Sequence, residues 1–281
     1  MQLPLRPFAV LGLLKELRVA AEDFRPLTVG GALAAQLVKE LAGNQRGRAE
    51  PDPASPSRSS ASPSPRQGGD PGAVREGGPE GAAAYVLVLA GAPSAEDEAV
   101  LRRAHRERVA VVVLARKRYD VPFVLPTDVI VVPPGQGFPV EELTRVLAAR
   151  LGEKGTALAA RLPVLRPPVC DWLITSFSRK NAIVAAAVFV PGVDLPVLTL
   201  NQMRLVLRIA AAHGEEISSE RLPELLAVLG GGLAFRAVAR ELLDLVPGVG
   251  WAVKGAVAYA GTRALGEAAV RLFAARAAAR A

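Results

Sequence analysis

The stretch that decides the fold is Ala84-Tyr85-Val86-Leu87-Val88-Leu89-Ala90, in which no charged side chain interrupts the apolar ones. A Val/Leu run of this length predicts a strand buried on both faces, as the strands of parallel sheets are. Two more runs of the same kind follow at 109–114 and 129–132. Between the first two, Ser94 is a predicted N-cap with Asp97 three residues later, an approximate capping box that opens a helix to about residue 108.

A second helix follows the third run. Pro139 fits its first turn, and Glu141 and Glu142 lie near the positive end of its dipole, so we expect it to reach Leu151. Buried strands that alternate with helices are typical of an α/β domain with a parallel sheet.

The chain before this region contains weaker signals. Residues 9–24 have apolar positions at helical spacing, 27–29 predict a short strand, and 32–41 predict a second helix. Residues 44–68 are rich in Pro and Ser and cannot form a core, so we expect a disordered insertion there. A further short strand is expected near 73–75.

From Gly152 onward no segment predicts a strand, so the domain boundary is expected near residue 155. Residues 1–155 are then a degenerate α/β domain, and 156–281 are all-α. The helices expected after the boundary cover residues 156–162, 169–178, 181–190, 199–213, 223–230, 234–245, 251–261 and 263–281.

Composition limits the possible functions. The chain has 281 residues, 51% of them hydrophobic, and a formal net charge of +7. The basic residues are spread out, without the dense Lys/Arg runs or interleaved aromatics of nucleic-acid-binding proteins, so we expect no nucleic-acid partner. An anionic membrane surface suits such a charge better. Residues 1–14 lack a clear small-residue cleavage site, so no secretory signal is expected.

Residues that carry out chemistry are scarce. Cys170 is the single cysteine, and His105 and His213 are the two histidines. Neither histidine lies in a recognisable signature, and we expect Cys170 to be a small buried helix residue. The sequence therefore predicts no catalytic residue, no metal site and no cofactor.

The α/β half has the strand and helix order of a nucleotide-binding domain but lacks the expected motifs. Gly30 and Gly31, between the first strand and the first helix, are weak candidates for a phosphate site, because glycines let an anion approach a helix N-terminus. The Lys-Ser/Thr pair that would hold phosphate and magnesium is absent. A tight turn explains the two glycines as well.

A base-recognition tetrad is also missing. After the strand at 109–114 the chain reads Ala115-Arg116-Lys117-Arg118, and Asp120 is displaced from the place of the base-binding carboxylate. These cations are either solvated loop charges or contacts for an acidic partner. The rigid segment 133–139 follows the next strand, at an edge where α/β sheets bind ligands. We therefore expect a Rossmann- or G-domain-like skeleton without its catalytic loops.

One phrase occurs twice in the helical half, as Val190-Pro191-Gly192-Val193 and Val246-Pro247-Gly248-Val249. In each copy a proline ends a helix and a glycine allows a turn, which predicts a helical hairpin. Lys180 and Arg204 enclose about 23 residues whose single charge is Asp194, close to the length of one bilayer crossing.

Several features favour a shallow or re-entrant hairpin over a single span. Pro191 and Pro196 break the helix near its middle, and basic residues at both ends favour the cytoplasmic side for both. Asp194 is costly in hydrocarbon unless it is paired or reaches the far interface. The second hairpin has only about nine uncharged residues between Asp244 and Lys254. A dry core of a soluble helical domain would explain both hairpins as well.

These residues suggest a family. Residues 189–196, 200–202, 209–214 and 245–250 resemble the bacterial YcjF-like family, domain of unknown function 697, over roughly residues 165–275. The resemblance implies a helical, often membrane-associated module that frequently follows a GTPase domain. It implies no activity and carries over no functional residue.

The leading hypothesis is a non-catalytic, membrane-associated bacterial protein whose hairpins dock on or in the cytoplasmic membrane. The first alternative is a nucleotide-responsive switch with a non-standard site at Gly30 and Gly31. The second is a soluble scaffold that binds a protein partner, such as a GTPase or a second copy of the chain.

Overall fold

The computed structural model describes residues 12, 15, 16, 19, 23–43, 70, 72–187, 195–215 and 250–279. These residues form two compact units. The sheet unit comprises Phe24–Val169, and the helical unit joins Cys170–Ala278 to the described residues before Phe24. Each unit is described by itself. The predicted insertion at 44–68 and the helices expected at 223–230 and 234–245 lie outside the described residues.

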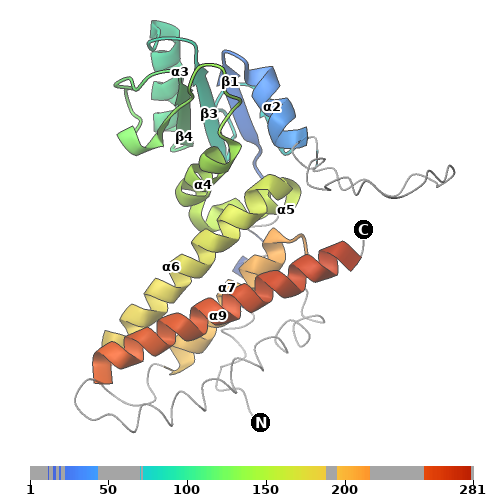
Figure 1. Cartoon of the computed structure of the whole chain (residues 1–281), viewed down its shortest axis with the longest axis vertical. Coiled ribbons are helices and arrows are strands. Elements are labelled where there is room, and N and C mark those ends of the chain that lie inside the picture. The colour runs from blue at the N-terminus through green and yellow to red at the C-terminus, as the bar shows by residue number, and fades with distance from the viewer. Residues whose placement is uncertain are drawn as a thin grey trace, which may run out of the picture. The chain divides into compact units, whose positions relative to one another are not determined.

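The sheet unit is built on five parallel strands in the order β2-β1-β3-β4-β5 (Figure 1). The strands are β1 (Leu27–Gly31), β2 (Val74–Glu76), β3 (Ala84–Leu89), β4 (Ala110–Ala115) and β5 (Val129–Val131). The central strand β3 is buried at all six positions, because helices or loops cover both of its faces. The parallel α/β sheet predicted from the Val/Leu runs is confirmed.

Three helices flank the sheet: α2 (Ala34–Gly43), α3 (Ala95–Arg106) and α4 (Val140–Leu151). The chain moves from β1 to β2 through α2 and from β3 to β4, in the opposite direction, through α3. Right-handed crossovers therefore place α2 and α3 on opposite faces, as Figure 1 shows. On the α3 face, Tyr85, Leu87 and Leu89 of β3 belong to one apolar cluster with Leu101 of α3.

The capping box at the start of α3 is present as predicted. The Ser94 hydroxyl accepts a hydrogen bond from the Asp97 amide at 3.1 Å, and the Ser94 amide donates to the Asp97 carboxylate at 2.9 Å. Three acidic residues occupy the first turn, where they favour the positive end of the helix dipole. Local sequence thus fixes this helix start.

The sheet unit contains further short helical segments. It contains α5 (Gly155–Arg161) and short 3₁₀ turns at Pro126–Asp128, Gly152–Lys154 and Pro163–Leu165. No strand follows Val131 in the parts of the chain that the structure describes, as the sequence predicted.

The helical unit contains α6 (Arg166–Ala187), which begins just before the unit boundary, α7 (Leu195–Ala212) and α9 (Gly250–Ala279). Residues 12, 15, 16 and 19 are also helical. The prediction of helix breaks inside α6 and α9 is wrong. Arg179 and Lys180 are exposed on one continuous helix, and Gly261 and Thr262 continue α9 because Thr262 is buried and hydrogen-bonded in the unit. Charged and small residues here mark helix faces, not helix ends.

Helix α7 begins four residues earlier than predicted. Pro196 fits its first turn, where the missing amide hydrogen costs nothing. Thr199 therefore lies inside the helix and is 7% exposed, so the helix start predicted at residue 199, with Thr199 as its N-cap, is wrong. Most of the α7 side chains whose burial is described are buried, which explains why most residues of this helix are apolar. Its buried apolar residues are Leu198, Met203, Leu205, Val206, Leu207, Ile209, Ala210 and Ala212.

Two arginines of α7 bind the N-terminal helix. The guanidinium of Arg208 donates to Glu16 at 2.9 Å, and that of Arg204 donates to the other oxygen of the same carboxylate at 3.2 Å. The Arg208 side chain is 7% exposed, so its charge needs such a partner. Glu16 thus links its helix to α7 within the helical unit.

No described helix combines the length and apolar character needed to cross a bilayer.

Candidate functional site

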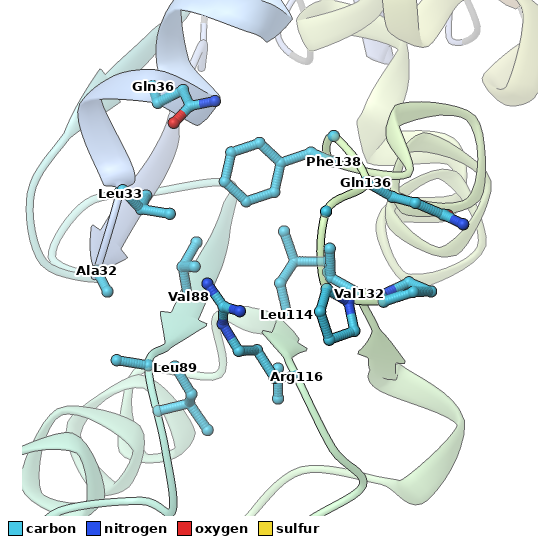
Figure 2. A pocket seen from close by; sticks show the side chains of 16 residues that line it. Ala32, Leu33, Gln36, Val88, Leu89, Leu114, Arg116, Val132, Gln136 and Phe138 are labelled. Atoms are coloured by element: carbon cyan, nitrogen blue, oxygen red, sulfur yellow. The ribbon is translucent and has the colours of Figure 1, made fainter.

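A cleft of about 370 Å³ lies at the carboxyl ends of the parallel strands (Figure 2). The chain leaves β1 and β3 in opposite directions, and this reversal opens the crevice in which open α/β sheets bind ligands. The volume falls in the usual range for small-molecule sites, about 300–1,000 Å³. Its lining residues are Ala32, Leu33, Gln36, Val88, Leu89, Ala90, Leu114, Ala115, Arg116, Val132, Pro133, Pro134, Gly135, Gln136, Gly137 and Phe138.

The cleft has an apolar floor and apolar walls. Val88 and Leu114 are buried side chains on neighbouring strands, paired in the register of β3 and β4. Leu33, before α2, and Phe138, after β5, line it from two separate loops. In Figure 2 the Phe138 ring reaches inward on the side of Leu33 and Gln36. Residues far apart in the sequence thus form one apolar surface.

Leu33 adopts a backbone conformation that is rare for its type. Its φ is +60°, and its side chain is 57% exposed at the cleft. The Leu33 carbonyl accepts hydrogen bonds from the amides of Gln36 and Leu37, which starts α2 directly after the turn. A non-glycine residue with a positive φ lowers the stability of the fold by about 1–3 kcal/mol, which contacts of the surrounding turn must offset.

Arg116 is the single ionisable side chain of the cleft lining. It directly follows β4, is exposed, and points into the cleft beside Val88 and Leu114 (Figure 2). Across the described part of the chain it forms no ion pair or hydrogen bond. The cleft is therefore electropositive. Of the basic residues at 116–118 only Arg116 lines it, and Asp120 does not.

Gly30 and Gly31 lie within β1, and neither lines the cleft. A Cβ at Gly30 would collide with the Tyr85 hydroxyl of β3, and one at Gly31, with φ at +87°, would collide with the Val88 carbonyl. The space beside both glycines is filled by protein atoms, so strand packing accounts for them.

The tyrosine beside Gly30 has a shifted pKa. Burial, followed by the charges of Asp97 and Glu80, raises the pKa of Tyr85 to about 12.

The other candidate residues are distributed over the molecule. Cys170 is buried and 2% exposed. The His105 ring lies 5.2 Å from that of Phe123, and His213 Nδ1 is 2.8 Å from the Ile209 carbonyl. None of the three lines the cleft, and no three potential metal ligands cluster among the described residues.

The predicted hairpin turns, Pro191, Gly192, Asp194, Pro247 and Gly248, lie outside the described residues. The two helices beside the first turn are described, and each exposes a large apolar side chain near it. Ile183 of α6 is 68% exposed, and Val197 of α7 is 47% exposed. Arg179 and Lys180 are exposed one turn before Ile183.

A polar cluster that sequence reasoning missed lies inside the helical unit. Asn181 of α6, which is 0% exposed, donates to the Thr262 hydroxyl of α9 at 2.9 Å and accepts from the Asn201 amide of α7 at 2.9 Å. Gln202 donates to the same Thr262 hydroxyl at 3.2 Å. The sequence signal that could have predicted this cluster is the presence of amide and hydroxyl side chains within helices that are otherwise largely apolar.

The comparisons with known proteins identify no relative. No family model matches the chain, and neither the curated proteins nor the solved structures gave a match.

Proposed function

We propose that this chain is a non-catalytic protein that docks on the cytoplasmic face of an anionic membrane. Contact is made by the apolar tip, which we define as the exposed side chains of Ile183 and Val197, on either side of the connection at residues 188–194. The observation that carries the proposal is the exposure of Ile183 and Val197, at 68% and 47%, on the two helices that flank this connection. The connection itself reads Val-Phe-Val-Pro-Gly-Val-Asp, with six apolar or turn residues before its single acid.

Charge around the tip suits an anionic surface. Arg179 and Lys180 are exposed on α6 next to Ile183. Basic residues beside exposed apolar side chains are typical of segments that lie in the membrane interface. Each adds about 1 kcal/mol near anionic lipid, and burial of one Ile or Val side chain adds about 1.5–3 kcal/mol. Together these terms support weak, reversible binding.

The docking that we propose is shallow. Beyond the first turns of α7, the apolar side chains of Met203, Leu205–Leu207, Ile209, Ala210 and Ala212 are buried in the helical unit and are not available to lipid. A tip inserted to the depth of the headgroups leaves this core intact.

Vesicle flotation of the full chain tests the proposal. The chain should float with phosphatidylcholine–phosphatidylserine vesicles, and an Ile183→Glu/Val197→Glu double variant should bind at least about tenfold more weakly. The matched control is Leu125→Glu/Val131→Glu, which places the same two charges at side chains of the sheet unit that are 55% and 40% exposed. The proposal fails if the wild type stays with the buffer, or if tip and control variants float equally.

The helical hairpins and the ancestry of the sheet unit are also proposals. We propose that the two Val-Pro-Gly phrases turn helical hairpins of a YcjF-like module and that the sheet unit is a degenerate nucleotide-binding domain. The all-parallel order β2-β1-β3-β4-β5 and the cleft at the strand reversal support the latter. This order is that of the flavodoxin-like doubly wound sheet and differs from the dinucleotide-binding order 3-2-1-4-5-6.

The two alternative functions predict different results. A soluble scaffold would leave vesicles unbound and would lose a protein partner in the tip variant but not in Leu125→Glu/Val131→Glu. A nucleotide-responsive switch would give saturable heat with GTP or ATP in calorimetry. Its control cannot be a Gly30 variant, because a side chain there disturbs Tyr85.

A further inference from the structure

We infer that the cleft of the sheet unit binds a small molecule with a flat apolar body and one anionic group, a phosphate or a carboxylate. This site is separate from the apolar tip and does not depend on the membrane proposal. Three properties of the cleft carry the inference: its apolar surface, one cation that no described residue pairs with, and a lining in which the described residues include no acidic side chain.

The apolar surface sets the body of the ligand. Val88 and Leu114 form a floor of two paired strand residues, while Leu33 and Phe138 stand at the sides. The Phe138 side chain is partly exposed and lines the cleft, so part of its ring can contact a planar group there. Leu33 is held exposed beside the cleft although burial of such a side chain is favourable, and a bound apolar group would cover it.

Arg116 sets the charge of the ligand. A guanidinium presents a planar fork of donors that matches a phosphate or a carboxylate. Since no described residue pairs with Arg116, the fork is available to a ligand. The apolar floor beside it lowers the local dielectric and strengthens an ion pair there. A cationic ligand would meet repulsion from Arg116 and would find no carboxylate in the lining.

Neutral donors and acceptors in the cleft are few. The side chains of Gln36 and Gln136 are the remaining polar ones in the lining. Gln36 lies on the same side of the cleft as Phe138 and Leu33 (Figure 2). Its amide nitrogen donates to the Glu40 carboxylate at 3.3 Å, so its carbonyl oxygen is the atom that would accept a hydrogen bond from the edge of the flat body while Arg116 binds the anion. The lining contains no His, Cys, Ser, Thr, Asp or Glu, so the ligand is bound without any lining side chain that would accept its proton.

Calorimetry on the full chain with a matched series of probes tests this site. The probes are 1-naphthyl phosphate, 1-naphthoate, 1-naphthol and inorganic phosphate. At least one of the two naphthyl anions should bind saturably, at least about tenfold more tightly than both 1-naphthol and inorganic phosphate. Whichever anion binds more tightly identifies the phosphate or the carboxylate as the natural group.

The matched variants are Arg116→Gln and Arg118→Gln. Both remove one exposed cation from the same loop, but only Arg116 lines the cleft. Arg116→Gln should weaken the naphthyl anion at least about tenfold, while Arg118→Gln should change its affinity less than about twofold. Phe138→Ala should weaken both naphthyl anions and leave inorganic phosphate unchanged.

The inference is overturned if neither naphthyl anion gives saturable heat, if both Arg variants weaken binding equally, or if 1-naphthol binds as tightly as the anions. Thermal melting confirms that each variant is folded. Vesicle flotation of Arg116→Gln should match the wild type, so failure of this site and failure of the membrane proposal are distinguished.

Discussion

In the sheet unit the layer between the strands and α3 is apolar, and the polar side chains of the cleft lie at the carboxyl ends of the strands. The helical unit, by contrast, places polar side chains at its centre. Leu87 and Leu101 belong to the apolar layer of the first, and Asn181 and Thr262 join α6 to α9 in the second. The amide and hydroxyl groups of this cluster bind one another, while Arg116 of the sheet unit has no partner among the described residues. This difference supports our two proposals, small-molecule binding by the sheet unit and membrane contact through Ile183 and Val197 of the helical unit.

The largest predicted effect is the loss of Asn181. Asn181→Ala removes hydrogen bonds to Thr262 and Asn201 inside the helical unit. Two lost bonds and newly unpaired groups should lower the free energy of unfolding by about 3 kcal/mol, measured by urea denaturation. Arg179→Ala, at an exposed position on the same helix, should change it by less than about 0.5 kcal/mol. Equal losses in both variants would contradict a polar centre that holds the helices together.

The second prediction concerns pH and the sheet unit. Burial raises the pKa of Tyr85 to about 12, above about 10 for an unfolded tyrosine. The stabilisation is fully present below about pH 10, and it is lost as the pH rises through about 12, because the unfolded phenol releases its proton first.

Comparison with Tyr85→Phe isolates this group from other groups that titrate in base. Between about pH 9 and about pH 12 the wild type should lose on the order of 2 kcal/mol relative to the variant, measured by urea denaturation. Parallel pH dependence of the two proteins would show that the Tyr85 hydroxyl is not buried in the folded state.

The third prediction separates packing from ligand binding at the first strand. Gly30→Ala should lower the free energy of unfolding by about 1–3 kcal/mol, because its Cβ meets the Tyr85 hydroxyl. Gly91→Ala is the matched control, since no atom lies within 4 Å of its added Cβ. The interpretation of Gly30 as a packing residue is wrong if both variants are equally stable and only Gly30→Ala loses a bound nucleotide.

The smallest prediction has the opposite sign. Ser178 is 0% exposed, and its hydroxyl has no hydrogen-bond partner among the residues that the structure describes. Ser178→Ala should therefore leave stability unchanged or raise it by up to about 1 kcal/mol, measured in the same denaturation series. A loss comparable to that of Asn181→Ala would place Ser178 in the polar cluster.

Most of the sheet could be predicted from the sequence because its signals are local. The Val/Leu run at β3 and the capping box at Ser94 need no knowledge of distant residues. The helix breaks expected after Ser178 and at Gly261 were wrong because the continuity of these helices depends on residues distant in the sequence. Contacts between helices keep α6 and α9 continuous there, such as the bond from Asn181 to Thr262.

The cleft could be predicted only in its location. The sequence indicated a possible site after the strands, but its residues come from four separate segments, made of strand ends, loops and the start of α2, that the strand order brings together. Arg116 was one of three adjacent basic residues with no local feature to distinguish it. Leu33 carried no signal, because its positive φ follows from the turn between β1 and α2.

Depth measurement at the apolar tip tests the central claim most directly. Nitroxide labels on Ile183→Cys, Val197→Cys and Leu125→Cys, each in a Cys170→Ala background, report contact with oxygen and with a water-soluble relaxing agent. With phosphatidylserine-containing vesicles, the labels at 183 and 197 should gain contact with oxygen and lose contact with the water-soluble agent, while the label at 125 stays unchanged. Labels at 183 and 197 that keep their full aqueous contact on vesicles would contradict membrane docking by the helical unit.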